Sequence, residues 1–573
     1  MRLPRTAAAW LLLLLAVLLT VSAVIVDHSE YAPLLTLEEG HDLAWGATVF
    51  RALLLFHGLA LAAAVFFREK FAALASGTKN DGASGYCVSS REIWFLLILA
   101  FVALILRIPN LDSDLWVDEV FTLVDFVRAP WGEIVTSFPS QNQHLLYSIL
   151  ARASFDIFGE TAWALRLPAL LFGVLSIVGT YLLARKLLGR TTAMLASGLM
   201  AVSYHHVWFS QNARGYTGLL LFSILATWLY FEAFDRRNWT WWMLYSASII
   251  LGMWVHMTMA FVGLAHGLSY LFFLAFPSAG RDEWAESGSP ERYSGLMPIA
   301  AWALSVTVTA QLYALALPEF LREGLHEESK DALWTNPVWV ITESLQNLSI
   351  GFAGIAVVLL GGAFLAFGWF CLYKKNKRAA IVMALPPVFA GTLMLSLGHN
   401  LFPRFFFFAV GFALIIVIQG ALALPAFLGS FIKPLKEKGS LLRIAGIGFG
   451  LLMVAASLIT VPRNYFLPKQ DFSGAREFVE SARGPNDTVI GASIAGTMYE
   501  RYYAPDWKTA ENKQELESLE GEGGVWLVYT LSPEIVAFHP EMWKKINTEY
   551  DVVKTFPGTL NGGEIYVCRK REE

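Results

Sequence analysis

The sequence predicts a polytopic α-helical membrane protein, with about 13 transmembrane helices and a small α/β domain at its C-terminal end. Of the 573 residues, 55% are hydrophobic and only 16% are charged. Soluble domains carry about 25% charged residues, because a folded chain needs them on its solvated surface. The low charge therefore indicates that most of this chain is surrounded by lipid.

Composition also excludes several classes of protein. The formal net charge of -4 provides no basic surplus for binding nucleic acid. The three cysteines, Cys87, Cys371 and Cys568, are too few and too far apart for a disulfide framework or a thiolate metal site. We therefore exclude a soluble metabolic enzyme, a nucleic-acid-binding protein and a disulfide-rich secreted module.

Apolar runs that approach the ~20 residues of a membrane span recur along the chain. The first run follows two arginines and no small-residue cleavage site clearly follows it, which favours a membrane anchor over a signal peptide. The stretch 241–276 is too long for one span and short for two, so the number of spans depends by one on whether this stretch crosses the membrane once or twice. The runs are residues 7–26, 44–67, 92–108, 169–188, 193–209, 218–234, 240–255, 257–276, 297–317, 354–373, 379–397, 405–425 and 441–461.

The distribution of Lys and Arg predicts the orientation, because cytoplasmic loops of membrane proteins carry an excess of both. Alternate loops of this chain are basic, and the loops between them hold fewer cations. This alternation predicts a multi-pass protein of the cell or inner membrane, with its N-terminus in the cytoplasm and its C-terminal end outside. The basic loops hold Arg68, Lys70, Lys79, Arg91, Arg185, Lys186, Arg190, Arg236, Arg237, Arg281, Arg292, Lys374, Lys375, Lys377, Arg378, Lys433, Lys436, Lys438 and Arg443.

We expect the chain to have three parts. Residues 1–91 contain two N-terminal helices and a cytoplasmic loop, and residues 92–461 form a transmembrane region whose first outer loop, 109–168, is large. Residues 462–573 form the outer α/β domain. There, a GPND turn signal and short β-rich runs such as DTVIGAS, GVWLVYT and GEIYVC accompany an amphipathic helix expected at 472–482.

The first outer loop is too long to be a simple connection between two spans. Its pattern predicts short helices at residues 120–129 and 144–158. The second has an apolar stripe that would suit a helix lying along the membrane interface. The loop is therefore the first place to look for a functional site.

Four acids gather where this loop leaves the membrane, in the segment RIPNLDSDLWVDEVF. Asp118 and Glu119 point in different directions on a helix, so one can face a site while a cation holds the other. The alternative interpretation is a helix N-terminus, where acids favour the helix dipole. Asp112 and Asp114 have the spacing of a metal- or nucleotide-binding pair, but a solvated turn explains them equally well.

Several cations lie on the same outer side as Asp118. Arg166 stands at the start of one span, Arg214 lies in the loop SQNARGYT, Arg404 opens PRFFFF, and His256 ends a span. Each arginine alone is equally consistent with a side chain that reaches up to the interface. Together, against the positive-inside bias, they suggest an anionic ligand held by guanidinium groups, as a phosphate is.

The order of these motifs resembles that of the GT-C glycosyltransferases. Arg107 is followed by LWVDE, HLLY, FGETAWALRLP, ARGY and a late PRFFFF, and the resemblance covers roughly residues 92–425. The chain is most similar to the dolichyl-phosphate-mannose protein mannosyltransferase-like group (glycosyltransferase family 39) and to its relatives, the lipid A aminoarabinose transferases. The two spans before Glu92 look like an addition to the family core.

The resemblance implies a GT-C fold and transfer of a sugar, with inversion, from a polyprenyl phosphate to an outer-face protein, lipid or glycan acceptor. It implies that Asp118 and Glu119 are the catalytic pair, with Asp118 as general base. No cofactor is expected, and a divalent metal is left open, because arginines suffice to hold a monophosphate leaving group. The residues expected to bind substrate are Arg107, His144, Arg166, Arg214, Tyr216, His256 and Arg404.

This sequence departs from the family pattern at two places. Leu145 follows His144 where the family usually has proline. The sequence alone therefore does not predict whether the backbone after His144 has the family's conformation. Some relatives also carry a second acid near the outer end of a later span, whereas Arg214 and Tyr216 occupy the nearest position here. The sequence therefore assigns no second acid.

The sequence is also compatible with two other functions. A transporter or flippase of a lipid-linked or anionic substrate would also place charges at span ends, although the sequence shows no repeated halves and no matching Gly/Pro-broken spans. A non-catalytic membrane subunit would use the C-terminal domain for docking. That function predicts tolerance of Asp118→Asn, whereas a transferase predicts loss of activity with normal folding.

Overall fold

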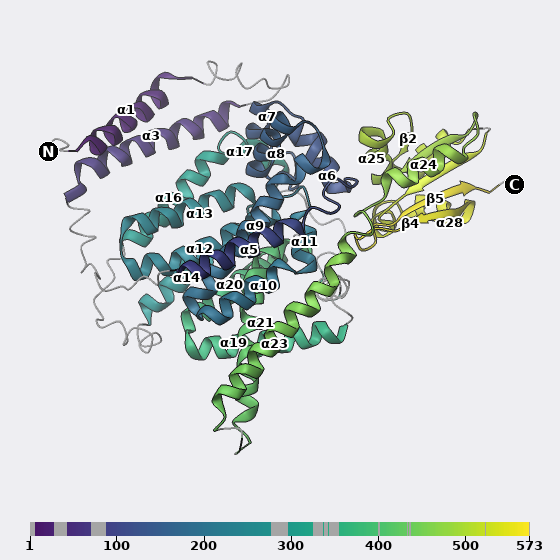
Figure 1. Ribbon diagram of the computed structural model, residues 1–573. Coiled ribbons are helices and arrows are strands. Elements are labelled where there is room, and N and C mark those ends of the chain that lie inside the picture. Colours follow the sequence, from purple (N-terminus) through teal and green to yellow (C-terminus); the bar gives the residue numbers. More distant parts are fainter. Residues whose placement is uncertain are drawn as a thin grey trace.

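The computed structural model is a bundle of helices with an α/β region at one end (Figure 1). It describes residues 6–27, 43–69, 88–276, 296–324, 336, 342, 355–398, 401–432, 434, 437–521 and 523–571. The expected class, a polytopic helical membrane protein with a small C-terminal sheet, is confirmed. Residues named above that lie outside the described ranges are Lys70, Lys79, Cys87, Arg281, Arg292, Lys433 and Lys436.

Within the described residues, nine helices are long and apolar enough to cross a membrane. They are formed around α1 (Ala7–Ile25), α3 (Ala44–Phe66), α9 (Ala162–Leu187), α12 (Tyr216–Arg236), α16 (Leu296–Tyr313), α19 (Ile355–Lys375), α20 (Lys377–Ser396), α21 (Val410–Gly429) and α23 (Gly439–Thr460). Shorter apolar helices are α5 (Ser90–Ile105), α10 (Arg190–Ala201), α13 (Trp239–Val255) and α14 (Met259–Ala275). The count of about 13 spans stays a prediction.

One expected span, residues 193–209, is wrong. The chain forms α10 and then a separate short helix, α11 (Tyr204–Ser210). Ser203 lies between the two helices, and its hydroxyl accepts a hydrogen bond from the backbone N–H of His206, which caps the new helix. The ambiguous stretch 241–276 resolves into α13 and α14, which are separated at His256.

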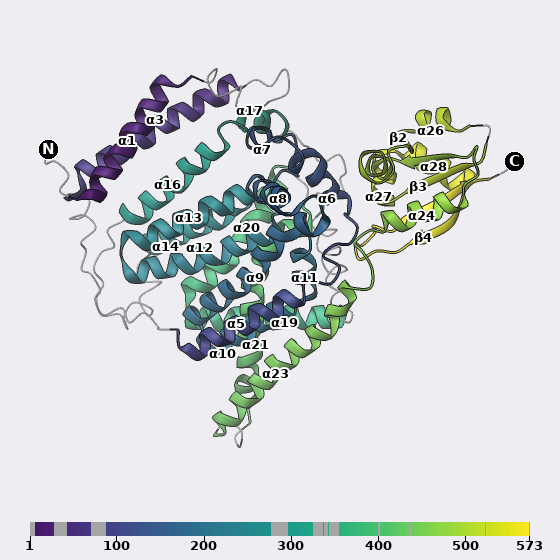
Figure 2. The same ribbon diagram turned by 45° about the horizontal axis from the view of Figure 1, so that its top comes forward.

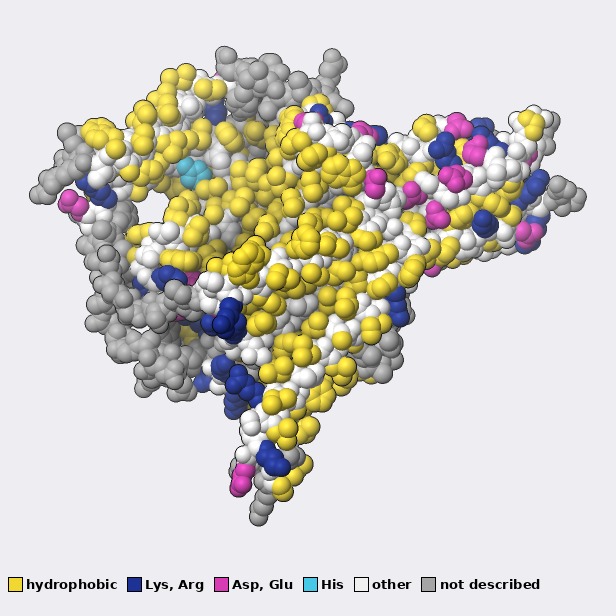
Figure 3. Space-filling view, viewed as in Figure 1, with side chains coloured by type: hydrophobic (Ala, Val, Ile, Leu, Met, Phe, Trp, Pro, Cys, Tyr) yellow, Lys and Arg dark blue, Asp and Glu magenta, His cyan; other side chains and the backbone are white. Residues whose placement is uncertain are grey.

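Basic side chains gather at the end of the bundle away from the α/β region. Lys186 and Arg236, at the ends of α9 and α12, both pair with Glu232, at 3.0 Å and 2.7 Å. Arg378, at the start of α20, lies 4.1 Å from the ring centroid of Phe234. Figure 3 shows an apolar surface over the bundle, with Lys and Arg concentrated at this lower end. The helices thus run between a basic end and the end that carries the outer loop.

The N-terminal helices α1 and α3 lie side by side at one edge of the bundle (Figures 1 and 2). Gly46 of α3 approaches α16 so closely that a Cβ atom there would lie 2.6 Å from the carbonyl oxygen of Ala314. Gln311 of α16 donates a hydrogen bond to the carbonyl of Phe50 at 3.1 Å. This pair of helices therefore contacts the bundle along α16.

The outer loop forms the short elements α6 (Val117–Phe121), the π-helical turn η2 (Thr122–Val127), α7 (Trp131–Thr136) and α8 (Leu145–Phe158). The two expected helices are confirmed, and the first begins three residues earlier than predicted. Leu145 occupies the first helical position after His144. Proline is favoured at this position, so the departure from the family pattern leaves the backbone suitable for a helix start.

The C-terminal region contains a five-stranded sheet with strand order β2-β1-β3-β5-β4. Strand β1 pairs in parallel with β2 and β3, whereas β5 pairs antiparallel with β3 and β4. The sequence patterns predict β1, β3 and β5; β2 is short and β4 is exposed at the edge, so neither shows a clear pattern. The strands are β1 (Thr488–Ala492), β2 (Lys508–Ala510), β3 (Val525–Tyr529), β4 (Tyr550–Phe556) and β5 (Ile565–Lys570).

Helices cover this sheet and connect it to the bundle. The expected amphipathic helix forms α24 over the predicted residues, Phe472–Ala482. The remaining short elements are α17 (Leu317–Glu319), η5 (Phe320–Gly324), η6 (Pro403–Ala409), η7 (Val461–Asn464), α25 (Ile494–Met498), η8 (Tyr499–Tyr503), α26 (Lys513–Leu519), α27 (Ser532–Phe538) and α28 (Pro540–Glu549).

One apolar core joins the outer loop to the α/β region. Leu115 and Trp116 of the loop belong to the same buried cluster as Phe472 and Tyr503. The Tyr503 hydroxyl donates to the carbonyl of Leu115 at 2.7 Å. The α/β region is therefore packed onto the segment that carries the Asp-Glu pair.

Candidate active site

Glu119 forms a buried ion pair with Arg166 at the start of α9. The two side chains are fully buried and joined by two hydrogen bonds, Nε to Oε1 at 2.8 Å and Nη2 to Oε2 at 2.6 Å. The other N–H groups of Arg166 donate to the carbonyls of Leu111, Ser113 and Asp114. Because every part of this guanidinium is used inside the protein, Arg166 holds the outer loop in place and is not oriented toward a ligand.

Glu119 also accepts hydrogen bonds from other elements. The backbone N–H of Ala213 donates to Oε1 at 2.6 Å, and Lys469 Nζ lies 3.5 Å from the same oxygen. Burial alone would raise the pKa of Glu119, but the charges of Arg166 and Lys469 outweigh burial, so its pKa lies below the ordinary value. The carboxylate is thus ionised and fully paired, which makes it a structural centre.

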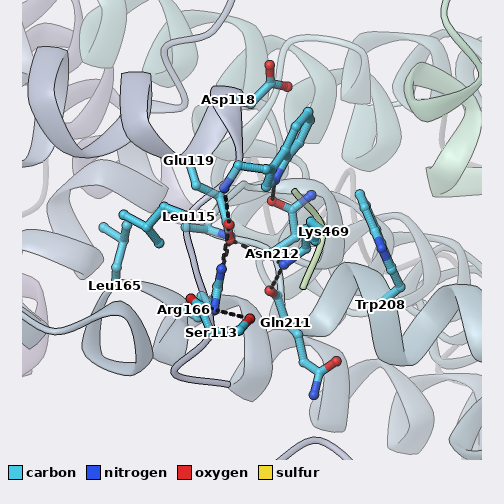
Figure 4. Close-up of polar contacts among 12 residues, drawn as sticks. Ser113, Leu115, Asp118, Glu119, Leu165, Arg166, Trp208, Gln211, Asn212 and Lys469 are labelled. Atoms are coloured by element: carbon cyan, nitrogen blue, oxygen red, sulfur yellow. Dashed lines mark hydrogen bonds and ion pairs between the residues drawn. The ribbon is translucent and has the colours of Figure 1, made fainter. Parts of the chain in front are cut away.

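Asp118 points away from this network, as Figure 4 shows. Its side chain is largely buried, and its Oδ2 lies 3.4 Å from Nη1 of Arg404 on η6. This oxygen accepts no hydrogen bond from any residue that the structure describes. Asp118 therefore has a charge partner but keeps a free acceptor site, in contrast to Glu119.

His144 and Arg214 meet beside the loop that precedes α12. The N–H of Gly215 donates to His144 Nδ1 at 2.7 Å, and a Cβ atom on Gly215 would lie 2.7 Å from that same nitrogen. Arg214 donates to the carbonyl of Asn142 at 2.8 Å and to its Oδ1 at 2.9 Å. Only glycine allows this close approach, which explains the Gly of the ARGY motif.

A second histidine and a tyrosine complete the cluster. The His144 ring contacts the rings of His256 and Tyr216, with centroid distances of 4.7 Å and 5.4 Å. Burial and the positive charge of Arg214 lower the pKa of His256 to about 3 and that of His144 well below its ordinary value. Both imidazoles are therefore neutral. Because His256 Nδ1 accepts a hydrogen bond from the N–H of Thr258, its proton lies on Nε2, where it can be donated to a ligand. His144 Nδ1 accepts from the N–H of Gly215, and its Nε2 lies 3.4 Å from Nη2 of Arg214.

Unpaired polar atoms converge in this cluster. Besides Asp118 Oδ2, the Nε atoms of Arg214 and Arg404 are buried and lack a hydrogen-bond partner among the described residues. Buried polar groups in folded proteins are almost always paired, and exceptions call for an explanation. Two guanidinium donors and one carboxylate oxygen without partners indicate a site for a ligand that carries an anionic and a hydroxyl group.

Other predicted residues lie elsewhere. Arg107 is fully buried, and it donates to the carbonyls of Ala103 and Ala201 while its Nη2 lies 2.6 Å from His206 Nδ1. The arrangement favours a structural role over substrate binding. Asp114 accepts two hydrogen bonds from Ser473, so it anchors the α/β region.

The carboxylate of Asp112 accepts a hydrogen bond from the backbone N–H of Trp163, on the exposed side of the loop. Among the described residues, no group of three or more His, Cys, Asp or Glu side chains is arranged to hold a metal ion. The interpretation of Asp112 and Asp114 as a metal-binding pair therefore has no support in the described part of the chain. The expectation that no metal is needed stays a prediction.

Sequence reasoning missed residues that the tertiary structure brings to this region. Thr122 and Asn142 bind the Arg214 guanidinium. Lys469 and Gln470, in the connection between α23 and α24, reach Glu119 and the backbone of Val117. These side chains belong to segments without a motif, so the sequence carries no signal for their roles.

The fold and the site define a polytopic membrane protein with a cation-rich polar cluster at one end of its bundle. Residues 142–289 match the model of the dolichyl-phosphate-mannose-protein mannosyltransferase family. A putative mannosyltransferase, YkcB of Bacillus subtilis (strain 168), is 32% identical over 181 residues, which cover 28% of this chain and 24% of the relative. The match spans about a quarter of that relative's length. These findings confirm the resemblance inferred from the sequence.

Two solved structures are similar to the structure of this chain. ArnT from Cupriavidus metallidurans in the apo state has a TM-score of 0.45 and 12% identity, covering 84% of this chain and 98% of that chain. The oligosaccharyltransferase AglB from Archaeoglobus fulgidus has a TM-score of 0.45 and 14% identity, covering 84% of this chain and 74% of that chain.

Proposed function

We propose that this protein is a membrane glycosyltransferase. It moves a sugar from a polyprenyl phosphate to an acceptor at the outer face of the membrane, with inversion at the anomeric carbon. The observation that carries this proposal is the group of unpaired buried atoms on Asp118, Arg214 and Arg404. The family match over residues 142–289 supports a lipid-linked donor of the dolichyl-phosphate-mannose kind.

Each group in the cluster has a task in such a transfer. The acceptor hydroxyl attacks the anomeric carbon while its proton passes to Asp118 Oδ2, and the bond from that carbon to the phosphate oxygen breaks. The departing polyprenyl phosphate gains negative charge, which Arg214 and Arg404 stabilise. The Nε2–H group of His256 supplies a further donor for the phosphate oxygens or the sugar hydroxyls.

Donor binding would also prepare the base. In the structure described here, Arg404 Nη1 is 3.4 Å from Asp118 Oδ2, a separation without a hydrogen bond. A phosphate between Arg214 and Arg404 draws the second guanidinium toward itself and leaves Asp118 to accept the acceptor's proton.

The distribution of charge supports the proposed orientation. The basic ends of α9 and α12 meet at Glu232, at the opposite end of the bundle from the Asp118 cluster. By the positive-inside rule, that end faces the cytoplasm and the cluster faces the outside. A lipid-linked sugar would then be used on the outer side, where the α/β region can contact the acceptor.

The test is transfer by the purified full-length protein in lipid nanodiscs, with labelled polyprenyl-phosphate sugars as donors and membrane extract as acceptor. Asp118→Asn removes the base while it keeps the size of the side chain. We expect the rate to fall roughly 100-fold or more, the usual contribution of a general base. Arg404→Gln should lower kcat and raise KM for the donor, because its guanidinium both binds the phosphate and stabilises the charge that develops on it.

The matched control is Asp112→Asn, which changes an exposed acid of the same loop and keeps an oxygen for the Trp163 N–H. It should transfer at the wild-type rate. Failure of the wild-type protein to consume any donor would overturn the proposal. Donor that moves across the bilayer of sealed vesicles without sugar transfer would favour a flippase instead.

A further inference from the structure

Helix α6, which carries Asp118, begins without a capping side chain of its own. The first N–H groups of a helix have no partner within it and need an acceptor from elsewhere. Trp116 precedes α6, and its indole ring offers a donor but no acceptor. The N–H of Val117 donates instead to Oε1 of Gln470 at 3.1 Å, 353 residues further along the sequence. A distant segment therefore fixes the start of α6.

The amide group of Gln470 is fully buried and hydrogen-bonded at both of its polar atoms. Its Nε2 donates to Thr530 Oγ1 at 2.9 Å and to the carbonyl of Gly563 at 3.2 Å. Thr530 directly follows strand β3, and Gly563 lies shortly before strand β5, which pairs with β3. Because these acceptors take both N–H groups, the amide oxygen is left to face Val117. Gln470 thus joins two adjacent strands of the sheet to α6.

The residue on the other side of Asp118 is fixed from the bundle. Glu119 accepts two hydrogen bonds from Arg166 of α9, at 2.8 Å and 2.6 Å. The α/β region therefore holds Val117, the residue before Asp118, and the bundle holds the residue after it. The backbone of Asp118 cannot turn without breaking one of these anchors, and its side chain points away from Glu119 (Figure 4). The two anchors together determine where the carboxylate of Asp118 lies.

Other contacts of the same segment attach the α/β region without reaching α6. The backbone N–H and the hydroxyl of Ser473 donate to the carboxylate of Asp114 at 2.7 Å and 2.8 Å. Nδ2 of Asn110 donates to the carbonyls of Asn464 and Leu467 at 3.0 Å and 3.1 Å. All of these bonds meet the outer loop before the first residue of α6. Attachment of the α/β region and control of α6 therefore depend on different side chains and can be separated by substitution.

We propose that Gln470 is a positioning residue for sugar transfer. It fixes the first turn of α6 and thereby the direction in which Asp118 Oδ2 meets the acceptor hydroxyl. This role rests on the function proposed above, in which Asp118 takes the acceptor's proton. Among the described residues, the partners of Gln470 are one amide of the outer loop and two groups beside the sheet, none of which is assigned to the donor phosphate. Gln470 therefore acts on the chemical step and leaves donor binding unchanged.

Gln470→Met tests this role, because methionine nearly matches the length of glutamine and replaces its amide with an apolar group. The assay is transfer by the full-length protein in nanodiscs, with the labelled polyprenyl-phosphate sugar that the wild type consumes. A displacement of about 1 Å at a reacting group can reduce a rate roughly 100-fold. We expect kcat to fall roughly 10- to 100-fold, while KM for the donor stays within about twofold of the wild-type value.

Two further measurements separate misplacement of Asp118 from loss of folded protein. Polyprenyl phosphate, the released product, should bind Gln470→Met with the Kd and the stoichiometry of wild type, because the cations that hold it are unchanged. Hydrogen exchange followed by mass spectrometry needs no transfer reaction. Because the Val117 N–H loses its acceptor, a peptide covering residues 116–121 should exchange faster in Gln470→Met than in wild type.

The matched control is Ser473→Ala, which removes a hydrogen bond to Asp114 and keeps the bond between Gln470 and Val117. It should retain the wild-type kcat and the wild-type exchange of residues 116–121. Wild-type kcat or unchanged exchange in Gln470→Met, or an equal loss of kcat in Ser473→Ala, would overturn the role of Gln470 and leave the transferase standing. A wild type that consumes no donor would overturn the proposed function and this role with it.

Thr530→Val is a milder second variant, which keeps the shape of the side chain and removes one acceptor of the Gln470 amide. The carbonyl of Gly563 still holds that amide, so kcat should fall less than in Gln470→Met. Added to Gln470→Met, it should cause little further loss, because both act through the same contacts. Wild-type kcat in Thr530→Val would overturn the role of Gln470 even where Gln470→Met fails to fold.

Discussion

Asp118 and Glu119 are neighbours in the chain, yet the structure gives their carboxyl groups opposite environments. Glu119 is buried, ionised and held by Arg166, Lys469 and the Ala213 N–H. Asp118 faces the other way, with Arg404 as its charge partner and an oxygen that accepts no hydrogen bond among the described residues. The first arrangement stabilises the fold, and the second is suited to chemistry.

These environments predict different effects of equivalent substitutions. Glu119→Gln leaves the Arg166 charge buried without a counter-ion, and breaking a buried pair in this way costs about 3–5 kcal/mol. We expect its unfolding temperature in detergent to fall well below that of wild type. Asp118→Asn should unfold at or above the wild-type temperature. A Glu119→Gln protein with full stability and no activity would show that Glu119 has a chemical role.

The sequence predicted much of this residue-scale arrangement, because adjacent residues of a helix must point in different directions. It also led us to expect one acid to be held by an arginine. It did not show which arginine, since Arg166, Arg214 and Arg404 are all cations near span ends. That choice depends on which guanidinium meets the carbonyls of the outer loop, and only the folded chain determines it.

At the scale of elements, the loop between α11 and α12 brings the site together. Its Ala213 N–H donates to Glu119, its Arg214 donates to the carbonyl of Asn142, and its Gly215 N–H donates to His144. The break after α10 produces the short helix α11, which leads into this loop. The sequence predicted the loop but also a continuous span over residues 193–209, because the apolar run hides the effect of the Ser203 cap.

Gly215→Ala tests this loop. The added Cβ would lie 2.7 Å from both His144 Nδ1 and Val255 Cγ1, so the imidazole must move. A shift of about 1 Å at a binding group can reduce the rate of an enzyme roughly 100-fold. We expect a comparable loss of transfer and a higher KM for the donor, measured in nanodiscs.

The control for this substitution is Gly263→Ala, where the nearest atom to the new Cβ is 3.8 Å away. That variant should transfer sugar like wild type. If Gly215→Ala also retains wild-type kinetics, His144 does not contribute to the site.

At the scale of the whole molecule, basic side chains gather at one end of the bundle. The basic ends of α9 and α12 lie together, and the α/β region lies at the other end (Figure 2). The outer loop and the α/β region share one apolar core. The basic end and the cluster around Asp118 thus lie at opposite ends of the bundle, and by the positive-inside rule we expect the basic end to face the cytoplasm.

Cysteine labelling in intact cells tests the orientation. A cysteine at the exposed Ser518 of α26 should react with a membrane-impermeant maleimide, because the α/β region is expected outside. A cysteine at the exposed Glu437, before α23, should react only after the cells are permeabilised. Labelling in the reverse order would invert the orientation and place the proposed transfer on the cytoplasmic side.

The sequence by itself determined the membrane class, most of the helices, the C-terminal sheet and the acidic pair, because these depend on local composition, periodicity and spacing. Tertiary structure alone decided that Arg166 belongs to Glu119 and Arg404 to Asp118, and that Gln470 of a distant segment reaches the backbone of Val117. The physical reason is that burial and charge pairing depend on distances between side chains that lie tens to hundreds of residues apart in the sequence. No local pattern encodes those distances.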